Sequence, residues 1–136
     1  MVHTTALDRH VVYNLHAHLV FVTKYRRGAM TDQILTRCEE ITRQVCSDFE
    51  AELKQFNGKA DHVHLLVHYP PKVQLSKLVN SLKGISARLI RKEYDSHIRR
   101  HLWGGHFWSS SYTARSCGGA PQTVVHQYIE NQKRPA

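Results

Sequence analysis

The sequence lacks the features of a membrane, secreted or disulfide-bonded protein. Its 136 residues contain no apolar run near the ~18 residues that a membrane span requires. His10, His16 and His18 interrupt any apolar core that a secretory signal would need. The three cysteines are odd in number and have no C-x-x-C spacing, which argues against a disulfide framework and a cysteine-based zinc site. We therefore expect a cytoplasmic protein with reduced cysteines.

Acidic residues are also scarce. Eleven of them stand against nineteen lysines and arginines, which gives a net charge of +8 and a pI near 9.7. Such an excess favours a polyanionic partner, most commonly nucleic acid, although basicity that only aids solubility is the alternative. No internal repeat, low-complexity tract or domain boundary is visible, so the length predicts one compact domain over residues 1–136, with a hinge-like linker at 117–121 before the last helix.

The hydrophobic patterns predict four strands and three helices. Alternating or apolar segments bounded by turn residues indicate strands over 14–23, 52–57, 61–69 and 106–115, with Gly58 ending the second. Three- and four-residue spacing indicates helices over about 31–49 and 75–91, and a last helix within 121–132. This order predicts an α+β, ferredoxin-like (split βαβ, RRM-like) antiparallel sheet, with helices on one face and an added C-terminal helix.

The third predicted strand carries an unusual histidine pattern. Residues two apart in a strand share a face, so His62 and His64 are expected to project together from the side opposite Val63 and Leu65. Two neighbouring imidazoles can share a metal ion. A polar face of unrelated histidines is the alternative, and His16 and His18 form a competing pair with the same spacing.

The last predicted helix places Tyr128 and Gln132 four residues apart, where their side chains are neighbours on a largely apolar face. A tyrosine at such a position is most often a packing residue. An amide in an apolar stripe needs a partner, which a metal ion or a phosphate would provide.

Together these segments resemble a known family. The run ADHVHLLV over 60–67 is similar to the His-hydrophobe-His strand of the HUH nucleases. With KYRR at 24–27, LKG at 82–84 and YIENQ at 128–132, the chain resembles a single-tyrosine HUH transposase of the IS200/IS605-like family. These small enzymes mobilise insertion sequences as single strands. The residues 58–60 (GKA) depart from the family, because many relatives carry a Met-Pro pair there.

The resemblance implies a DNA transposase that cleaves and rejoins single-stranded DNA through a covalent 5′-phosphotyrosine intermediate and recognises the hairpin ends of a mobile element. Tyr128 would be the nucleophile, while His62, His64 and Gln132 would hold Mg²⁺ or Mn²⁺; ligand chemistry alone does not exclude zinc. The resemblance also implies a homodimer in which the tyrosine helix of one subunit completes the histidine site of the other.

Several residues are candidates for holding single-stranded DNA. Cations can neutralise phosphates and an exposed aromatic ring can stack on a base. The candidates are Lys24, Tyr25, Arg26, Arg27, Lys83 and Arg88. Two other functions remain open: a domesticated HUH nuclease that acts on chromosomal repeats, and a non-catalytic RRM-like nucleic-acid-binding module. The second would place stacking aromatics on its central strands, where this sequence has histidines.

Overall fold

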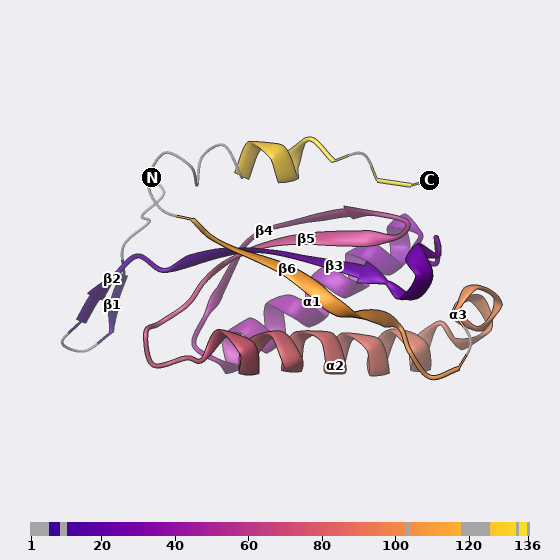
Figure 1. Ribbon diagram of the computed structural model, residues 1–136, viewed down its shortest axis with the longest axis horizontal. Helices are drawn as coiled ribbons and strands as arrows, with labels where there is room; N and C mark the ends of the chain where they lie inside the picture. Colours follow the sequence, from indigo (N-terminus) through magenta and orange to yellow (C-terminus); the bar gives the residue numbers. More distant parts are fainter. Residues whose placement is uncertain (1–5, 9–10, 103, 118–125, 133, 136) are drawn as a thin grey trace.

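The chain folds as two layers, a four-stranded antiparallel sheet and two long helices that cover one of its faces (Figure 1). The computed structural model describes residues 6–8, 11–102, 104–117, 126–132 and 134–135. The strand order is β4 (Glu52–Lys59), β5 (His62–His68), β3 (His16–Thr23) and β6 (Trp108–Cys117). The helices are α1 (Asp32–Asp48) and α2 (Leu75–Glu93). This confirms the expected α+β, ferredoxin-like class.

The two helices form where the apolar spacing predicts them. Thr31 caps α1, because its side-chain oxygen accepts a hydrogen bond from the backbone N–H of Ile34 at 3.2 Å. The apolar stripes of both helices are buried against the sheet; they comprise Ile34, Cys38, Ile41 and Val45 of α1 and Leu78, Val79, Leu82 and Ile90 of α2.

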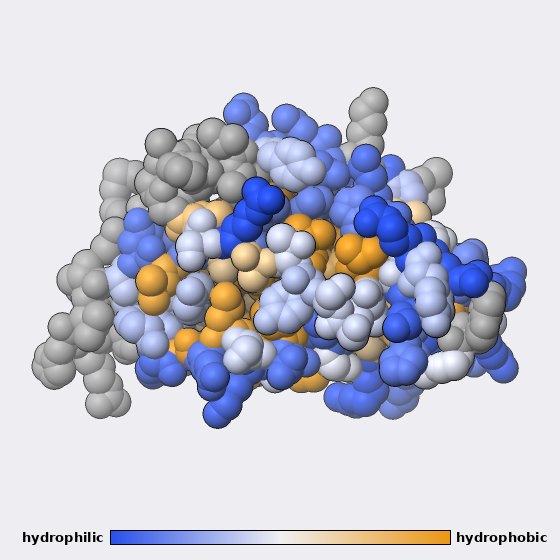
Figure 2. Space-filling view, viewed as in Figure 1, coloured by the Kyte–Doolittle hydropathy of each residue, from blue (hydrophilic) through white to orange (hydrophobic). Residues whose placement is uncertain are grey.

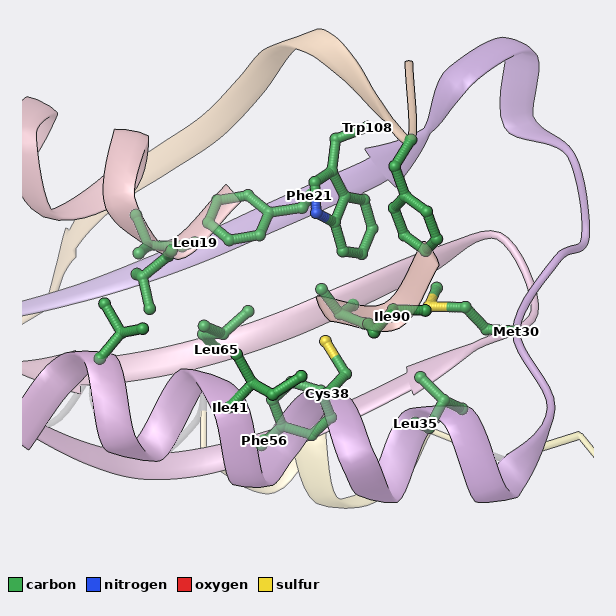
Figure 3. Packing of buried hydrophobic residues seen from close by; sticks show 14 of the residues in the cluster. Leu19, Phe21, Met30, Leu35, Cys38, Ile41, Phe56, Leu65, Ile90 and Trp108 are labelled. Carbon is green, nitrogen blue, oxygen red and sulfur yellow. The ribbon is translucent and has the colours of Figure 1, made fainter. Parts of the chain in front are cut away.

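The core lies between the helices and one face of the sheet (Figure 3). Leu19 and Phe21 of β3 and Leu65 of β5 pack toward Cys38 and Ile41 of α1 in a single cluster. Because strand side chains alternate, the same register turns the histidines of β3 and β5 to the opposite face. Core formation therefore places those histidines on the side away from α1 and α2.

Gly58 does not end β4, and that prediction is wrong. The strand runs through it to Lys59, with Gly58 opposite Val63 of β5. A Cβ atom at this position would lie 2.5 Å from the backbone oxygen of His62 and 3.1 Å from Cα of Val63. The glycine thus permits a close approach of β4 and β5 beside His62. Glycine in a strand can mark such a close backbone contact as well as a break.

Four short elements were not predicted: the hairpin of β1 (Ala6–Asp8) and β2 (Val11–Tyr13), the 3₁₀ turn η1 (Lys24–Arg26) and the helix α3 (Asp95–His101). The first predicted strand begins at His16 rather than residue 14, and Leu15 remains 37% exposed. Helical residues of the last helix are described over 126–130; residues 118–125, where its start was predicted, lie outside the described residues.

The surface agrees with the basic, polar composition. Hydrophilic residues predominate around the rim of the face drawn in Figure 2, and the apolar residues visible there form small patches between them. Within the part of the chain that the structure describes, no helix is both long and apolar enough to cross a membrane.

Candidate active site

The C-terminal segment lies over the histidine-bearing face of the sheet, on the side away from α1 and α2 (Figure 1). Its apolar anchor is Ile129, which is fully buried in a small cluster with Leu66 of β5 and Cys117 of β6. This cluster is separate from the main core. Both faces of the sheet are therefore covered, one by α1 and α2 and the other by the C-terminal segment, and a different cluster of buried residues holds each.

Polar contacts fix the same segment to β4 and α1. Asn57 donates from Nδ2 to the backbone oxygens of Ile129 and Gln132, at 3.2 and 2.8 Å. The Arg134 guanidinium donates to Oδ1 of Asn57 at 2.9 Å and pairs with Asp32 and Glu39 of α1, each at 3.2 Å. The two Asn57 hydrogen bonds satisfy carbonyls at the end of a helix, where no helical N–H remains to do so.

This anchoring places Tyr128 beside the histidines of its own chain. Its ring centroid lies 5.3 Å from that of His64 and 6.4 Å from that of His18, with the rings edge to face. Tyr128 is nevertheless 55% exposed. Because the Tyr128 phenol packs against His64 and His18 and is still exposed to solvent, it can reach a bound substrate.

His62 and His64 lie next to each other, with ring centroids 5.0 Å apart and planes at 82°. A neighbouring side chain contacts the Nδ1 atom of each ring. Oδ1 of Asp61 lies 2.7 Å from Nδ1 of His62, and Nε2 of His18 lies 3.0 Å from Nδ1 of His64. The Nε2 atom of His64 is buried and has no hydrogen-bond partner among the described residues. Leaving such an atom unpaired costs about 1–3 kcal/mol, so a ligand that occupies it would remove that cost.

The buried histidines favour the neutral form. Burial, with smaller contributions from the neighbouring His62, His18 and Lys59, lowers the pKa of His64 to about 4. Burial also lowers the pKa of His18, with a smaller contribution from Arg115. Neutral imidazole is the form that binds metals, and ligating histidines usually have their second nitrogen held by a protein group. The chemistry of these donors therefore fits a divalent metal.

Gln132 follows the helix and is half-buried. Its Nε2 donates to the backbone oxygen of Tyr128 at 3.3 Å, so part of its amide finds a partner within the terminal segment. Among the residues that the structure describes, no group of three or more His, Cys, Asp or Glu side chains could hold a metal ion. Among these described residues, a third protein ligand beside the two histidines would be of another type, such as an amide oxygen.

The predicted basic loop borders the histidine pair. Tyr25 and Arg26 of η1 both have left-handed backbone conformations, with φ of 58° and 52°, and Tyr25 is 77% exposed. The Lys24 ammonium lies 5.2 Å from the centroid of the Tyr25 ring, and the Arg27 guanidinium 5.9 Å. Arg26 pairs with Asp61 at 3.6 Å, and Asp61 in turn contacts His62. This turn thus presents an aromatic ring flanked by cations next to the candidate site.

The other two predicted DNA contacts lie on α2. Lys83 donates to the backbone oxygens of Ser109 and Ser110, at 2.7 and 3.3 Å, and its ammonium lies 5.4 Å from the centroid of the Tyr112 ring. Burial lowers its pKa. Arg88 is exposed on the same helix. Both belong to the helical layer, so the structure does not bring them to the histidine-bearing face.

Sequence reasoning missed the supporting residues His18, Asp61, Asn57 and Arg134. The two-residue spacing of His16 and His18 was a visible signal, but it pointed to a competing pair. The structure separates them: His18 contacts His64, whereas His16 stacks on His68 with ring centroids 4.4 Å apart. Arg134 and Asn57 are 77 residues apart in sequence, so no local pattern could have paired them.

Comparison with known proteins identifies the family of the chain. Residues 11–132 match the family described as "Transposase IS200 like". The ISDra2 transposase TnpA of Deinococcus radiodurans is 31% identical over 124 residues, which cover 91% of this chain and 88% of that protein. The transposase for insertion sequence element IS200 of Salmonella typhimurium is 27% identical over 123 residues, covering 90% and 80%.

Solved structures give the same result. A crystal structure of a Deinococcus radiodurans protein described as a transposase matches with a TM-score of 0.75 and 32% identity, covering 96% of this chain and 99% of the other. A REP-associated tyrosine transposase bound to a REP hairpin shares the fold, with a TM-score of 0.60 at 11% identity, covering 89% and 67%. On the family match and the Deinococcus relatives, this chain belongs to the IS200-like transposases, a family of DNA endonuclease and strand-transfer enzymes.

Proposed function

We propose that this transposase cleaves and rejoins single-stranded DNA through a covalent 5′-phosphotyrosine on Tyr128. The observation that carries the proposal is the exposed Tyr128 ring 5.3 Å from His64. The phenolic oxygen would bond to phosphorus as the bond to the 3′-oxygen breaks, and the departing oxygen would take up a proton as the 3′-hydroxyl. The ester keeps the energy of the phosphodiester, so strands can be rejoined by the reverse attack without ATP.

We further propose that His62, His64 and Gln132 hold a divalent ion, Mg²⁺ or Mn²⁺. When bound, such an ion would polarise the scissile phosphate and offset its developing charge. The contribution of the chain is to hold both imidazoles in place and to keep His64 neutral: Asp61 contacts His62, and burial opposes protonation of His64. The exposed side of Tyr128 leaves access for the DNA.

The proposed substrate is a DNA hairpin with flanking single strand at the end of a mobile element. Support comes from the REP-associated relative, whose structure holds a REP hairpin, and from the basic turn beside the site. Lys24, Arg26 and Arg27 can neutralise phosphates, while the exposed Tyr25 ring can stack on an unpaired base. Lys83 and Arg88 remain candidates for DNA that reaches the helical layer. Because such a substrate is cellular DNA, the proposed place of action is the cytoplasm.

A covalent adduct assay tests the nucleophile. Labelled hairpin DNA with a flanking single strand is incubated with protein and Mn²⁺, and a protein–DNA band that survives denaturing electrophoresis is expected. Tyr128→Phe should remove the band, because the attacking oxygen is gone. Tyr112→Phe is the matched control, since Tyr112 contacts Lys83 on the helical side of β6 and should keep the band. An adduct formed by Tyr128→Phe would refute the assignment.

The same assay separates the enzyme from a plain binding module. EDTA should abolish the adduct if the reaction needs a divalent ion. Hairpin binding that ignores EDTA, with no cleavage of any single strand, would favour the RRM-like module instead.

We also propose that the protein acts as a homodimer. The resemblance implies that the tyrosine helix is shared between subunits, whereas the 5.3 Å between the rings of Tyr128 and His64 of the same chain supports the alternative that each chain uses its own tyrosine. Mixing Tyr128→Phe subunits with His62→Ala/His64→Ala subunits decides between them. Recovery of adduct after verified subunit exchange means shared sites; no recovery means that each chain uses its own tyrosine.

A further inference from the structure

We propose that His18 is a positioning residue that holds His64 in the tautomer able to bind a metal ion. This inference rests on the proposed metal site. It concerns a histidine of β3 that lies beside the candidate ligands and has no role in the reaction as described above. Three observations carry it: the contact of His18 with His64, the unpaired outer nitrogen of His64, and the packing that fixes both rings.

The contact joins Nε2 of His18 to Nδ1 of His64 at 3.0 Å, and both rings are buried. A neutral imidazole carries one N–H and one lone pair, so only one of the two rings can donate. If His18 donates, the proton of His64 is on Nε2 and that atom cannot bind a metal. If His64 donates from Nδ1, its Nε2 keeps a lone pair.

The environment of Nε2 favours the second arrangement before any metal binds. This atom is buried without a hydrogen-bond partner among the described residues, so a proton placed there would have no described acceptor. A lone pair there could instead bind the ion. His18 would then accept from His64 through its own Nε2, as the outer partner of a metal-ligating histidine does in many proteins.

Packing leaves His18 little freedom to turn away. Its ring stacks on that of His64, with centroids 5.2 Å apart and planes at 20°, and the Tyr128 ring lies edge to face with both. Strand pairing sets the spacing, because β3 and β5 are in register with Val20 opposite His64 and His18 opposite Leu66. The hydrogen bond is thus imposed by the sheet and covered by the terminal helix.

The two candidate ligands are supported by different partners, and burial gives the reason. His62 is partly exposed and uses the carboxylate of Asp61, whose charge also pairs with Arg26. His64 lies deeper, where burying a charged carboxylate would cost more than burying a neutral ring. A neutral imidazole provides the acceptor without that charge, which explains why a histidine occupies position 18.

The test measures the tautomer of His64 and the affinity for Mn²⁺ as separate properties. Long-range ¹H–¹⁵N spectra of the EDTA-treated protein report which ring nitrogen carries the proton, and electron paramagnetic resonance titration reports Mn²⁺ binding. The variants are His18→Leu, which removes the acceptor, and His18→Gln, whose side-chain oxygen can replace it. His16→Leu is the matched control, because His16 lies on the same face of β3 but stacks on His68. Thermal unfolding and hairpin binding monitor the fold.

We expect His64 to carry its proton on Nδ1 in the unchanged protein and on Nε2 in His18→Leu. The Mn²⁺ affinity of His18→Leu should fall by about 10–100-fold, the usual effect of losing such a partner, and His18→Gln should restore most of it. His16→Leu should bind Mn²⁺ like the unchanged protein.

Two outcomes would overturn the inference: a proton on Nε2 of His64 in the unchanged protein, or Mn²⁺ affinity that His18→Leu leaves intact. Failure of the proposed metal site looks different, because the unchanged protein would then bind no Mn²⁺ whichever nitrogen carries the proton. A general loss of structure is recognised by a fall in hairpin binding and thermal stability that His18→Gln does not reverse.

Discussion

Replacing Gly58 by alanine should destabilise the fold and disturb the histidine site together. The added Cβ would lie 2.5 Å from the backbone oxygen of His62 and 3.1 Å from Cα and Cγ1 of Val63. Two of these atoms are backbone, so no side-chain rotation can relieve the contact. The strands β4 and β5 must therefore move apart next to His62.

The magnitude follows from two opposing effects. Overpacking of this kind typically costs about 1–3 kcal/mol. Replacing a strand glycine by alanine returns about 0.5–1 kcal/mol, because the unfolded chain loses freedom. The expected net change is therefore a loss of about 1 kcal/mol, and at most about 2.5 kcal/mol, in the free energy of unfolding. Since the displaced oxygen belongs to His62, Mn²⁺ affinity should fall as well.

Urea denaturation measures the first effect and Mn²⁺ titration the second. Gly84→Ala is the matched control: Gly84 lies exposed in α2, and a Cβ atom added there would meet no neighbouring side chain or strand within 4 Å. That substitution should stabilise the protein by about 0.5–1 kcal/mol, the usual gain in a helix. If Gly58→Ala proves as stable as the unchanged protein, the close approach of β4 to β5 is not a constraint and the reasoning fails.

Three further predictions concern the buried polar groups and the terminal segment. Burial lowers the pKa of His16 and His64 to about 4, so the unfolded chain binds protons at these positions more readily than the folded chain. The free energy of unfolding, measured by urea denaturation, should therefore be constant above about pH 6.5 and fall as the pH drops toward 4. His16→Leu should show a smaller fall over the same pH range. Ser86→Ala should lose about 1–3 kcal/mol of unfolding free energy, because the Trp108 indole N–H loses its acceptor at 3.0 Å; an unchanged denaturation midpoint would contradict this. Ile129→Ala should weaken docking of the terminal segment by about 2–5 kcal/mol, seen as faster amide exchange at Asn131 and Gln132 with unchanged exchange in the core strands.

The fold was predictable because its main elements carry strong local patterns. The alternation of β3 and β5 and the apolar stripes of α1 and α2 are complete within each segment. The missed helix α3 has seven residues and buries only Ile98, so it offers too little periodicity to detect. Gly58 was misread because the usual meaning of glycine in a strand, a break, differs from its role here in a close strand contact.

The candidate site was predictable only in part. The spacing of His62 and His64 fixes their shared face from sequence alone, and the structure places both there. The partners of these two histidines are determined differently. Asp61 is adjacent to His62 in sequence, but His18 reaches His64 only through the register of β3 against β5. The anchors Asn57 and Arg134 depend on how the terminal segment lies on the sheet, which no local pattern specifies.

The two faces of the sheet are covered by different elements: α1 and α2 stabilise the fold, and the terminal segment completes the candidate site. The helices α1 and α2 bury the large cluster that holds the described fold together, and Ile129 contributes nothing to it. In the described part of the terminal segment, the main anchors are one buried isoleucine, the two Asn57 hydrogen bonds and the ion pairs of Arg134. These ion pairs are partly exposed to solvent, so each adds little stability. Its docking free energy is therefore small beside that of the core. Tyr128 can thus be displaced from His64 without unfolding the sheet, so substitutions at these anchors should alter the reaction while leaving the global unfolding transition nearly unchanged.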